Sequence, residues 1–317
     1  MEFRHTAVLA DEVIAGLHIR PNGTYADGTL GGGGHAALLC GQLGRTGTFI
    51  GIDRDMDAID AAADRLAGYD CKKIFVHANY ADIKSVLAEN DIGGLDGALL
   101  DLGVSSWQLD NPARGFSYMQ DAPLDMRMDA SGEAGETAAL TAYDVVNGYS
   151  ERELTGVIKT YGEEKWASRI AKFIVAARGE APVASTGELV DIIKAAVPAS
   201  ARRDGPHPAK RTFQAIRIEV NSELDVLRSA ADDFIDVLSP GGRFAVITFH
   251  SLEDRIVKEA FRRHEDPCIC PKDIPMCVCG RTADVRRVNR KPILPKVRET
   301  EENPRARSAK LRIIEKI

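Results

Sequence analysis

Residues 24–35 read TYADGTLGGGGH, and residues 48–53 read TFIGID. A short apolar strand ends at Asp27 and runs into a loop of four glycines, and a second apolar strand ends at Asp53. Because glycine has no Cβ atom, a ligand can lie directly against the backbone of this loop. An acid after the second strand can accept hydrogen bonds from both hydroxyls of a ribose. These two segments therefore predict a site for a cofactor that contains adenosine.

Strands and helices alternate along the first hundred or so residues, which predicts a parallel, doubly wound α/β sheet. The next strand comes only at 243–249, after a gap far longer than one crossover needs. We therefore expect an all-helical domain at 109–211, inserted into a cofactor-binding domain made of residues 1–108 and 212–317. The expected strands are 23–27, 47–53, 73–77, 95–103 and 243–249. The expected helices of the insert are 150–161, 163–178 and 186–196, and one long helix, about 212–237, returns the chain to the sheet.

The composition suits a globular protein, since 44% of the 317 residues are hydrophobic and 28% are charged. The N-terminus lacks an apolar signal region and no apolar run is long enough for a membrane span, so we expect a cytoplasmic protein. The net charge is −6, but residues 281–312 hold eleven Lys or Arg against four Asp or Glu, a local charge of +7. This basic segment is either a surface that faces phosphates or a solvated strand and loop.

Four of the six cysteines form two Cys-x-Cys pairs, Cys268 with Cys270 and Cys277 with Cys279. In a cytoplasmic chain such a cluster indicates a metal before a disulfide. The Cys-x-Cys spacing is tighter than the usual spacing of zinc ligands. A structural zinc and a redox-sensitive or packed cysteine loop therefore both remain open, and no residue is assigned as a metal ligand.

The choice of cofactor depends on the acids at the ends of the strands. The loop fits Gly-x-Gly-x-x-Ala at Gly31, Gly33 and Ala36, so a nicotinamide-dependent dehydrogenase remains an alternative. However, Asp27 stands just before the glycines, where it would repel a pyrophosphate and attract a cationic sulfonium. Asp101 ends a neighbouring strand at the edge where ligands bind on such sheets. Both acids favour S-adenosylmethionine.

Seven segments spread over the whole chain resemble one family, the bacterial 16S ribosomal RNA cytosine-N4 methyltransferases. They are DGTLGGGGH at 27–35, DLGVSS at 101–106, GFSYM at 115–119, PLDMRMD at 123–129, RTFQA at 211–215, FHSLEDR at 249–255 and NPRARS at 303–308. The resemblance implies a class I methyltransferase fold, with the insert as the substrate-recognition domain. It implies methyl transfer from S-adenosylmethionine to N4 of a cytosine in the decoding region of 16S ribosomal RNA, within the small ribosomal subunit. A methyltransferase for amines of DNA or protein, and a non-catalytic RNA-binding protein, are the alternatives.

The resemblance also implies the residues that contact the cofactor: Gly33, Gly34, His35, Asp53, Tyr80, Asp101 and Gln108. Among them we expect Asp53 to take the ribose hydroxyls and Tyr80 to lie against the adenine. Asp101 is the best candidate for a catalytic residue, because it can meet the cationic end of the cofactor or hold the target amine. His250, with the neighbouring acids Glu253 and Asp254, is expected either to line the base pocket or to open a helix.

Overall fold

A computed structural model of the chain describes residues 7–129, 140–203, 206–271 and 276–317. The chain divides into two compact units. The first consists of Met1–Gly103 and Leu224–Ile317, and the second of Val104–Glu223. Among the described residues, no helix combines the length and the apolar character that a membrane span requires.

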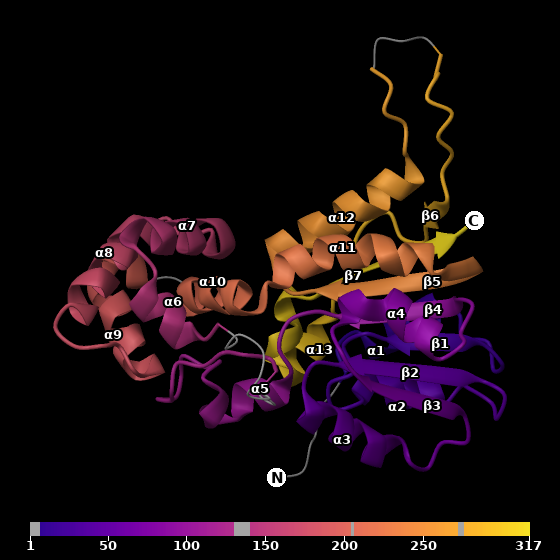
Figure 1. Cartoon of the computed structure of the whole chain (residues 1–317), viewed down its shortest axis with the longest axis horizontal. Helices are drawn as coiled ribbons and strands as arrows, with labels where there is room; N and C mark the ends of the chain where they lie inside the picture. Colours follow the sequence, from indigo (N-terminus) through magenta and orange to yellow (C-terminus); the bar gives the residue numbers. More distant parts are fainter. Residues whose placement is uncertain (1–6, 130–139, 204–205, 272–275) are drawn as a thin grey trace. The chain divides into compact units, whose positions relative to one another are not determined.

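One sheet forms the centre of the first unit, with the strand order β3-β2-β1-β4-β5-β7-β6 (Figure 1). The strands from β3 to β5 in that order run parallel, whereas β7 pairs antiparallel with both β5 and β6. The strands are β1 (Thr24–Asp27), β2 (Thr48–Asp53), β3 (Lys72–His77), β4 (Leu95–Asp101), β5 (Leu238–Thr248), β6 (Val285–Arg287) and β7 (Lys310–Lys316). The expected doubly wound α/β fold is thus confirmed, and it is the class I methyltransferase arrangement.

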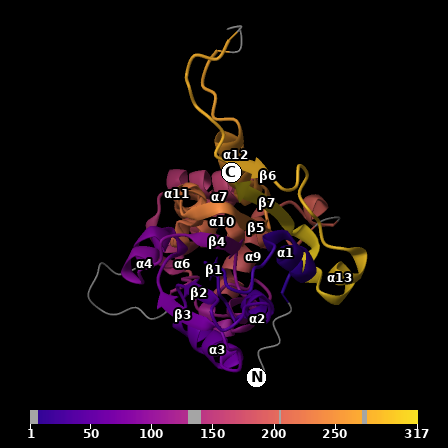
Figure 2. The same cartoon turned by 90° about the vertical axis from the view of Figure 1, so that its right-hand side faces the viewer.

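Helices cover both faces of this sheet, as Figure 2 shows for α1 and α2 on one side and α4 and α11 on the other. The helices and turns of 3-10 helix in this unit are α1 (Ala10–Leu17), α2 (Gly34–Cys40), α3 (Met56–Leu66), η1 (Tyr80–Asp82), α4 (Ile83–Glu89), α11 (Glu223–Asp236), α12 (Ser251–Glu265), α13 (Val297–Glu302) and η4 (Pro304–Ser308). Ion pairs of Lys84 with Asp233 and of Arg263 with Asp232 join α4, α11 and α12 into one layer.

Apolar burial explains why the sheet forms at this place in the chain. The middle strands are buried almost throughout, which is the pattern of parallel strands covered on both faces. Phe244 of β5 stacks on Phe234 of α11, with ring centroids 5.1 Å apart, and meets Phe261 of α12 edge-on at 5.8 Å. Aromatic packing of this kind anchors both helices to one face of the sheet.

In the second unit, all regular elements among the described residues are helices. Its elements are α5 (Ser106–Asp110), η2 (Pro112–Arg114), α6 (Ala142–Gly148), α7 (Glu151–Gly162), α8 (Ala167–Arg178), α9 (Thr186–Ala196), η3 (Ala199–Arg202) and α10 (Lys210–Asn221). Ser150 and Ser185 close capping boxes at the starts of α7 and α9, which explains why these helices begin there. The inner faces of α7, α8 and α9 bury an apolar core that includes Ile158, Ile170 and Ile193.

Two expectations about the elements were wrong. The long helix expected at 212–237 is two helices, α10 and α11, because Ser222 adopts a left-handed conformation with φ 51° and ends α10. As a result α10 packs on α6 and α7 inside the helical unit. The list of expected strands also lacked β6 and β7, although a solvated strand and loop was one of the two interpretations of the basic segment 281–312. β7 has the sequence KLRIIEK, buries Leu311, Ile313 and Ile314, and extends the sheet by pairing antiparallel with β5 and β6.

Candidate cofactor site

Three acids end three adjacent parallel strands of the first unit. Asp27 ends β1, Asp53 ends β2 and Asp101 ends β4, and β1 pairs with both of the other strands. Parallel strands present their carboxyl ends at the same edge of a sheet, and ligands of open α/β sheets bind at that edge. The register therefore brings together the three carboxylates that the sequence analysis had selected.

Asp53 holds the glycine loop by its side chain. Its Oδ2 accepts a hydrogen bond from the backbone N–H of Gly31 at 2.7 Å, and its Oδ1 accepts one from Asp55 N–H at 3.0 Å. Gly31 adopts φ +48°, which a residue with a side chain rarely does. A third backbone hydrogen bond to this carboxylate comes from Arg54. Because a carboxylate can accept about four hydrogen bonds, Asp53 keeps capacity for a hydroxyl of a ligand.

Thr29 links the other two acids, and the sequence analysis missed it. Its hydroxyl accepts a hydrogen bond from the backbone N–H of Asp101 at 2.6 Å and donates one to Asp27 Oδ1 at 3.3 Å. The backbone N–H of Thr29 donates to the same Asp27 oxygen at 3.0 Å. Thr29 stands between an acidic strand end and the glycines, and its hydroxyl can both donate and accept a hydrogen bond. These two properties are the signal from which its role could have been predicted.

Burial makes all three acids poor at carrying a negative charge. Loss of solvent raises the pKa of Asp27 to about 6 and that of Asp53 to about 6. The pKa of Asp101 rises to about 7, mainly because the carboxyl is buried and further because the negative charge of Glu253 lies nearby. A cation or a set of hydrogen-bond donors brought to this edge would stabilise the ionised acids.

His35 lies against Asp101 on the inner side of the loop. Its Nε2 contacts the carbonyl oxygen of Val8 at 2.8 Å, and its Nδ1 lies 3.5 Å from Asp101 Oδ2. Burial lowers the pKa of His35, so the ring is neutral near pH 7. A carbonyl only accepts, which places the single ring proton on Nε2 and leaves Nδ1 as an acceptor that faces Asp101. His35 therefore positions this carboxyl and favours its protonated form.

Close packing leaves little room for a side chain at two glycines of this region, Gly28 and Gly33. A Cβ atom at Gly28 would lie 2.6 Å from a methyl of Leu100 and 3.0 Å from the Cβ of Tyr80. Gly33 adopts φ +72° and packs on Ala62, at 3.1 Å from a Cβ in that position, directly before α2 begins at Gly34. Tyr80 thus lies beside the start of the loop, as its predicted role requires, and is partly exposed.

Gln108 is the one predicted cofactor residue outside this group. It belongs to the helical unit, where its side chain accepts a hydrogen bond from Ser105 N–H at 3.0 Å and its backbone N–H donates to Ser105 Oγ at 3.2 Å. This capping box starts α5 and buries Gln108. Its contact with the cofactor stays a prediction.

The segment that follows β5 serves to start a helix. His250 caps α12, and Glu253 Oε2 accepts hydrogen bonds from the backbone N–H groups of Phe249 at 2.7 Å and His250 at 3.3 Å. Asp254 is paired with Arg312 at 2.7 Å and Lys310 at 3.2 Å. Of the two roles expected for this segment, these contacts support the start of a helix. Buried Glu253 also acts electrostatically on Asp101.

The basic segment 281–312 is largely paired with acids of its own unit. The pairs are Arg286 with Glu315, Arg287 with Glu265, Lys296 with Glu12, Arg298 with Glu302, and both Lys310 and Arg312 with Asp254. These contacts offset much of the local charge, so the segment offers phosphate less than its count of basic residues indicates.

The residues of the strand-end site fit S-adenosylmethionine. Asp101 Oδ1 is buried and makes no hydrogen bond within the described part of the chain. Such an atom is costly unless a ligand supplies a donor or a positive charge. The adjacent Asp27 would repel the pyrophosphate of a dinucleotide but attract the sulfonium and amino groups of S-adenosylmethionine. The acid pattern thus favours the cationic cofactor over NAD.

Known proteins resemble this chain over its whole length. The sequence pattern of the MraW methylase family matches residues 2–317. Ribosomal RNA small subunit methyltransferase H of Acetivibrio thermocellus is 57% identical over all of both chains, and the protein of that name from Clostridioides difficile is 55% identical over all of both. A crystal structure of an rRNA methylase from Streptococcus thermophilus matches 97% of this chain and 93% of its own, with 11% identity and a TM-score of 0.42, a likeness too distant to inform function.

Proposed function

The chain belongs to the MraW methylase family, and from this we propose that it transfers a methyl group from S-adenosylmethionine to the exocyclic N4 of a cytosine in 16S ribosomal RNA. It is an enzyme, a methyltransferase that uses S-adenosylmethionine. The single observation that carries the assignment of the site is the group of three strand-end acids, Asp27, Asp53 and Asp101, around the glycine loop.

Each residue of the site has a proposed part in holding the cofactor. Asp53 accepts hydrogen bonds from the ribose hydroxyls, using the lone pairs that are not taken by the N–H groups of Gly31 and Asp55. Asp27 and Asp101 face the cationic end, and Tyr80 borders the adenine. Bound there, S-adenosylmethionine supplies a methyl group that is electrophilic because it is attached to a sulfonium. Gln108 keeps its proposed contact with the cofactor.

The difficult partner in this reaction is the cytosine amine, because its lone pair is delocalised into the ring. An acceptor that holds an amino hydrogen can fix the orientation of that nitrogen. Asp101 Oδ1 is buried and has its hydrogen-bonding capacity unused, so we propose it for this task. His35 and Thr29 position Asp101 through its other oxygen and its backbone N–H. Correct positioning of the reactants can lower an activation barrier by roughly 7–11 kcal/mol.

We propose that the helical unit, Val104–Glu223, recognises the RNA, and that the small ribosomal subunit in the cytoplasm is the substrate particle. The target base must leave its stack to reach a site of this kind. A target in the small subunit's RNA is in keeping with the name shared by the relatives at 55% and 57% identity, and we propose the decoding region as its place within that RNA.

The test is incubation of the enzyme and labelled S-adenosylmethionine with small subunits from a strain that lacks this methyltransferase. We expect label in N4-methylcytidine after digestion of the 16S ribosomal RNA to nucleosides. Parallel reactions contain naked 16S ribosomal RNA, duplex DNA and ribosomal proteins. Label in DNA or protein alone would replace the proposed substrate, and binding of NAD in preference to S-adenosylmethionine would overturn the cofactor.

A further inference from the structure

The segment between α12 and β6 contains four cysteines, and its described residues form no buried core. Its two arms, 267–271 and 276–280, leave α12 and return toward β6 side by side (Figure 1). Among the described residues between Asp266 and Asp284, none is buried, and Ile269, Met276 and Val278 are 65%, 76% and 76% exposed. A short segment with no apolar core needs another source of order, for which proteins use a disulfide or a metal.

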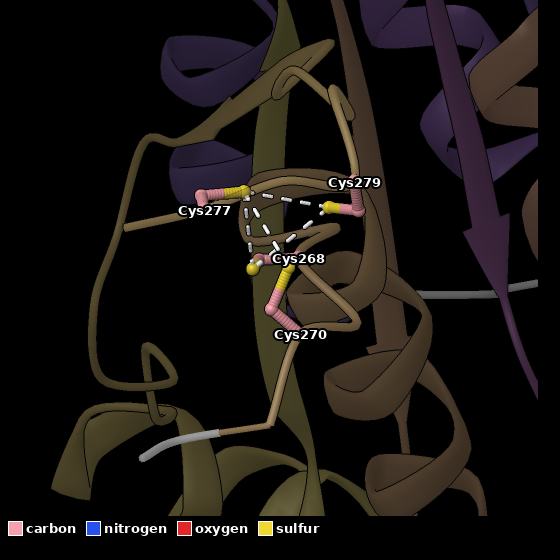
Figure 3. Close-up of side chains that lie close together, drawn as sticks. All are labelled: Cys268, Cys270, Cys277 and Cys279. Carbon is pink, nitrogen blue, oxygen red and sulfur yellow. Dashed lines mark hydrogen bonds between the residues drawn. The ribbon is translucent and has the colours of Figure 1, made fainter. Parts of the chain in front are cut away.

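The four thiols come together at the distances of a tetrahedral site. Cys277 Sγ lies 3.6 Å from Cys268 Sγ, 3.8 Å from Cys270 Sγ and 3.5 Å from Cys279 Sγ, and the sulfurs of Cys279 and Cys268 are 4.0 Å apart (Figure 3). All four sulfurs lie within 4.8 Å of one another. Four sulfurs held tetrahedrally at the Zn–S distance of about 2.3 Å are roughly 3.8 Å apart. All four cysteines are free thiols.

The spacing of the cysteines is also explained. In an extended chain, residues i and i+2 project from the same side, so each Cys-x-Cys pair can offer both sulfurs to one point. Two such arms side by side then supply four ligands, although Cys-x-Cys is shorter than the usual spacing on a zinc loop. The backbone N–H of Val278 donates to Cys270 Sγ at 3.4 Å, the kind of outer contact that orients a ligand thiolate.

We propose that Cys268, Cys270, Cys277 and Cys279 bind one structural Zn²⁺ that joins the two arms of this segment. Four thiols lose four protons as the ion binds, which leaves a closed tetrathiolate site with a net charge of −2 and no open position for catalysis. Zinc suits the site because it prefers four-coordinate thiolate ligands and undergoes no redox change. The proposal does not depend on the methyltransferase function.

The experiment measures metals in the full-length protein purified under reducing conditions and dialysed against excess zinc and then buffer. We expect about one zinc per chain by elemental analysis, its release when an organomercurial blocks the thiols, and the visible absorption of thiolate-bound cobalt after exchange with Co²⁺. Cys277→Ser is expected to lose the zinc, because its sulfur contacts the other three. The matched control, Cys71→Ser, changes a buried thiol elsewhere in the unit and is expected to keep it.

Limited trypsin digestion gives a second readout that does not depend on metal content. Removal of zinc, or Cys277→Ser, is expected to speed cleavage after exposed Arg281 at least tenfold, with the same circular dichroism spectrum as the wild type. Iron in place of zinc would overturn the proposal. A metal-free protein in which a thiol assay shows that the four cysteines have formed two disulfides would overturn it too. Equal loss of zinc from Cys71→Ser and Cys277→Ser would also overturn it.

Discussion

The backbone N–H of Gly31 donates a 2.7 Å hydrogen bond to Asp53 Oδ2, so the acid at the end of β2 fixes the glycine loop that follows β1. The same carboxylate is the proposed ligand of the ribose. One side chain therefore both shapes the loop and binds the cofactor, and the two contributions can be separated by substitution.

Asp53→Ala is expected to weaken binding of S-adenosylmethionine at least tenfold, because both the loop contact and the ribose acceptors are lost. Each tenfold change in the dissociation constant corresponds to about 1.4 kcal/mol. Asp53→Asn keeps one carbonyl oxygen, so its affinity for S-adenosylmethionine should lie between those of the wild type and Asp53→Ala. Isothermal titration calorimetry measures all three affinities.

The control for this series is Asp57→Ala, which removes an exposed acid from the first turn of α3. It should bind the cofactor like the wild type. Wild-type affinity in Asp53→Ala would show that the ribose is held elsewhere.

Asp101 predicts a particular dependence of stability on pH. Its pKa is raised from 3.8 to about 7 in the folded protein, chiefly because the carboxyl is buried. Above pH 4 the unfolded chain gains stability by ionising this group while the folded chain keeps the proton, so the wild type loses stability as the pH rises from about 4 to 7. Asp101→Asn removes that loss. We expect it to gain roughly 2–4 kcal/mol relative to the wild type between pH 4 and pH 8.

Urea unfolding followed by circular dichroism at the two pH values measures this difference, and Asp57→Asn is the exposed control. The same Asp101→Asn protein should lose nearly all methyl transfer while it still folds. A variant whose stability follows the wild type at both pH values would show that Asp101 is ionised in the folded state throughout this range.

Thr29 tests whether the link between the loop and β4 matters. Thr29→Val keeps the shape of the side chain but leaves the N–H of Asp101 without its acceptor, and an unsatisfied buried donor costs about 1–3 kcal/mol. Thr29→Ser keeps the hydroxyl and is the matched control. We expect the valine variant to lower the free energy of unfolding by that amount and to reduce turnover, with the serine variant close to the wild type. Equal effects of the two substitutions would assign the loss to packing.

Sequence alone predicted the parallel part of the sheet and the three acids that end its adjacent strands. Apolar strands that end in Asp27, Asp53 and Asp101 carry a strong signal, since parallel strands bring their carboxyl ends to one edge. The raised pKa values of these acids could not be read from the sequence, because they depend on how completely the fold removes water. The bond from Asp101 to Thr29 joins positions 72 residues apart, and no local pattern encodes it.

Other features escaped prediction for different reasons. The basic residues near the C-terminus left open a surface for phosphates or a solvated strand and loop, because ion pairs such as Arg312 with Asp254 form only when β7 joins the sheet. The cysteine spacing, tighter than is usual for zinc, left a structural zinc and a packed cysteine loop both open, because the sequence does not show that the two pairs lie within reach of one another. The cofactor contact of Gln108 came from the resemblance alone and stays a prediction, because the side chain of Gln108 takes part in the capping box of α5.

Ser222 explains why one expected helix is two, and it supplies the last prediction. It adopts φ 51° between α10 and α11, a conformation that costs a residue with a side chain about 1–2 kcal/mol but glycine little. Ser222→Gly should therefore raise the free energy of unfolding by roughly 0.5 kcal/mol, net of the entropy that glycine loses. Ser229→Gly, at an exposed position inside α11, should lower it by a similar amount. Thermal unfolding measures both, and destabilisation by both would mean that Ser222 is not strained.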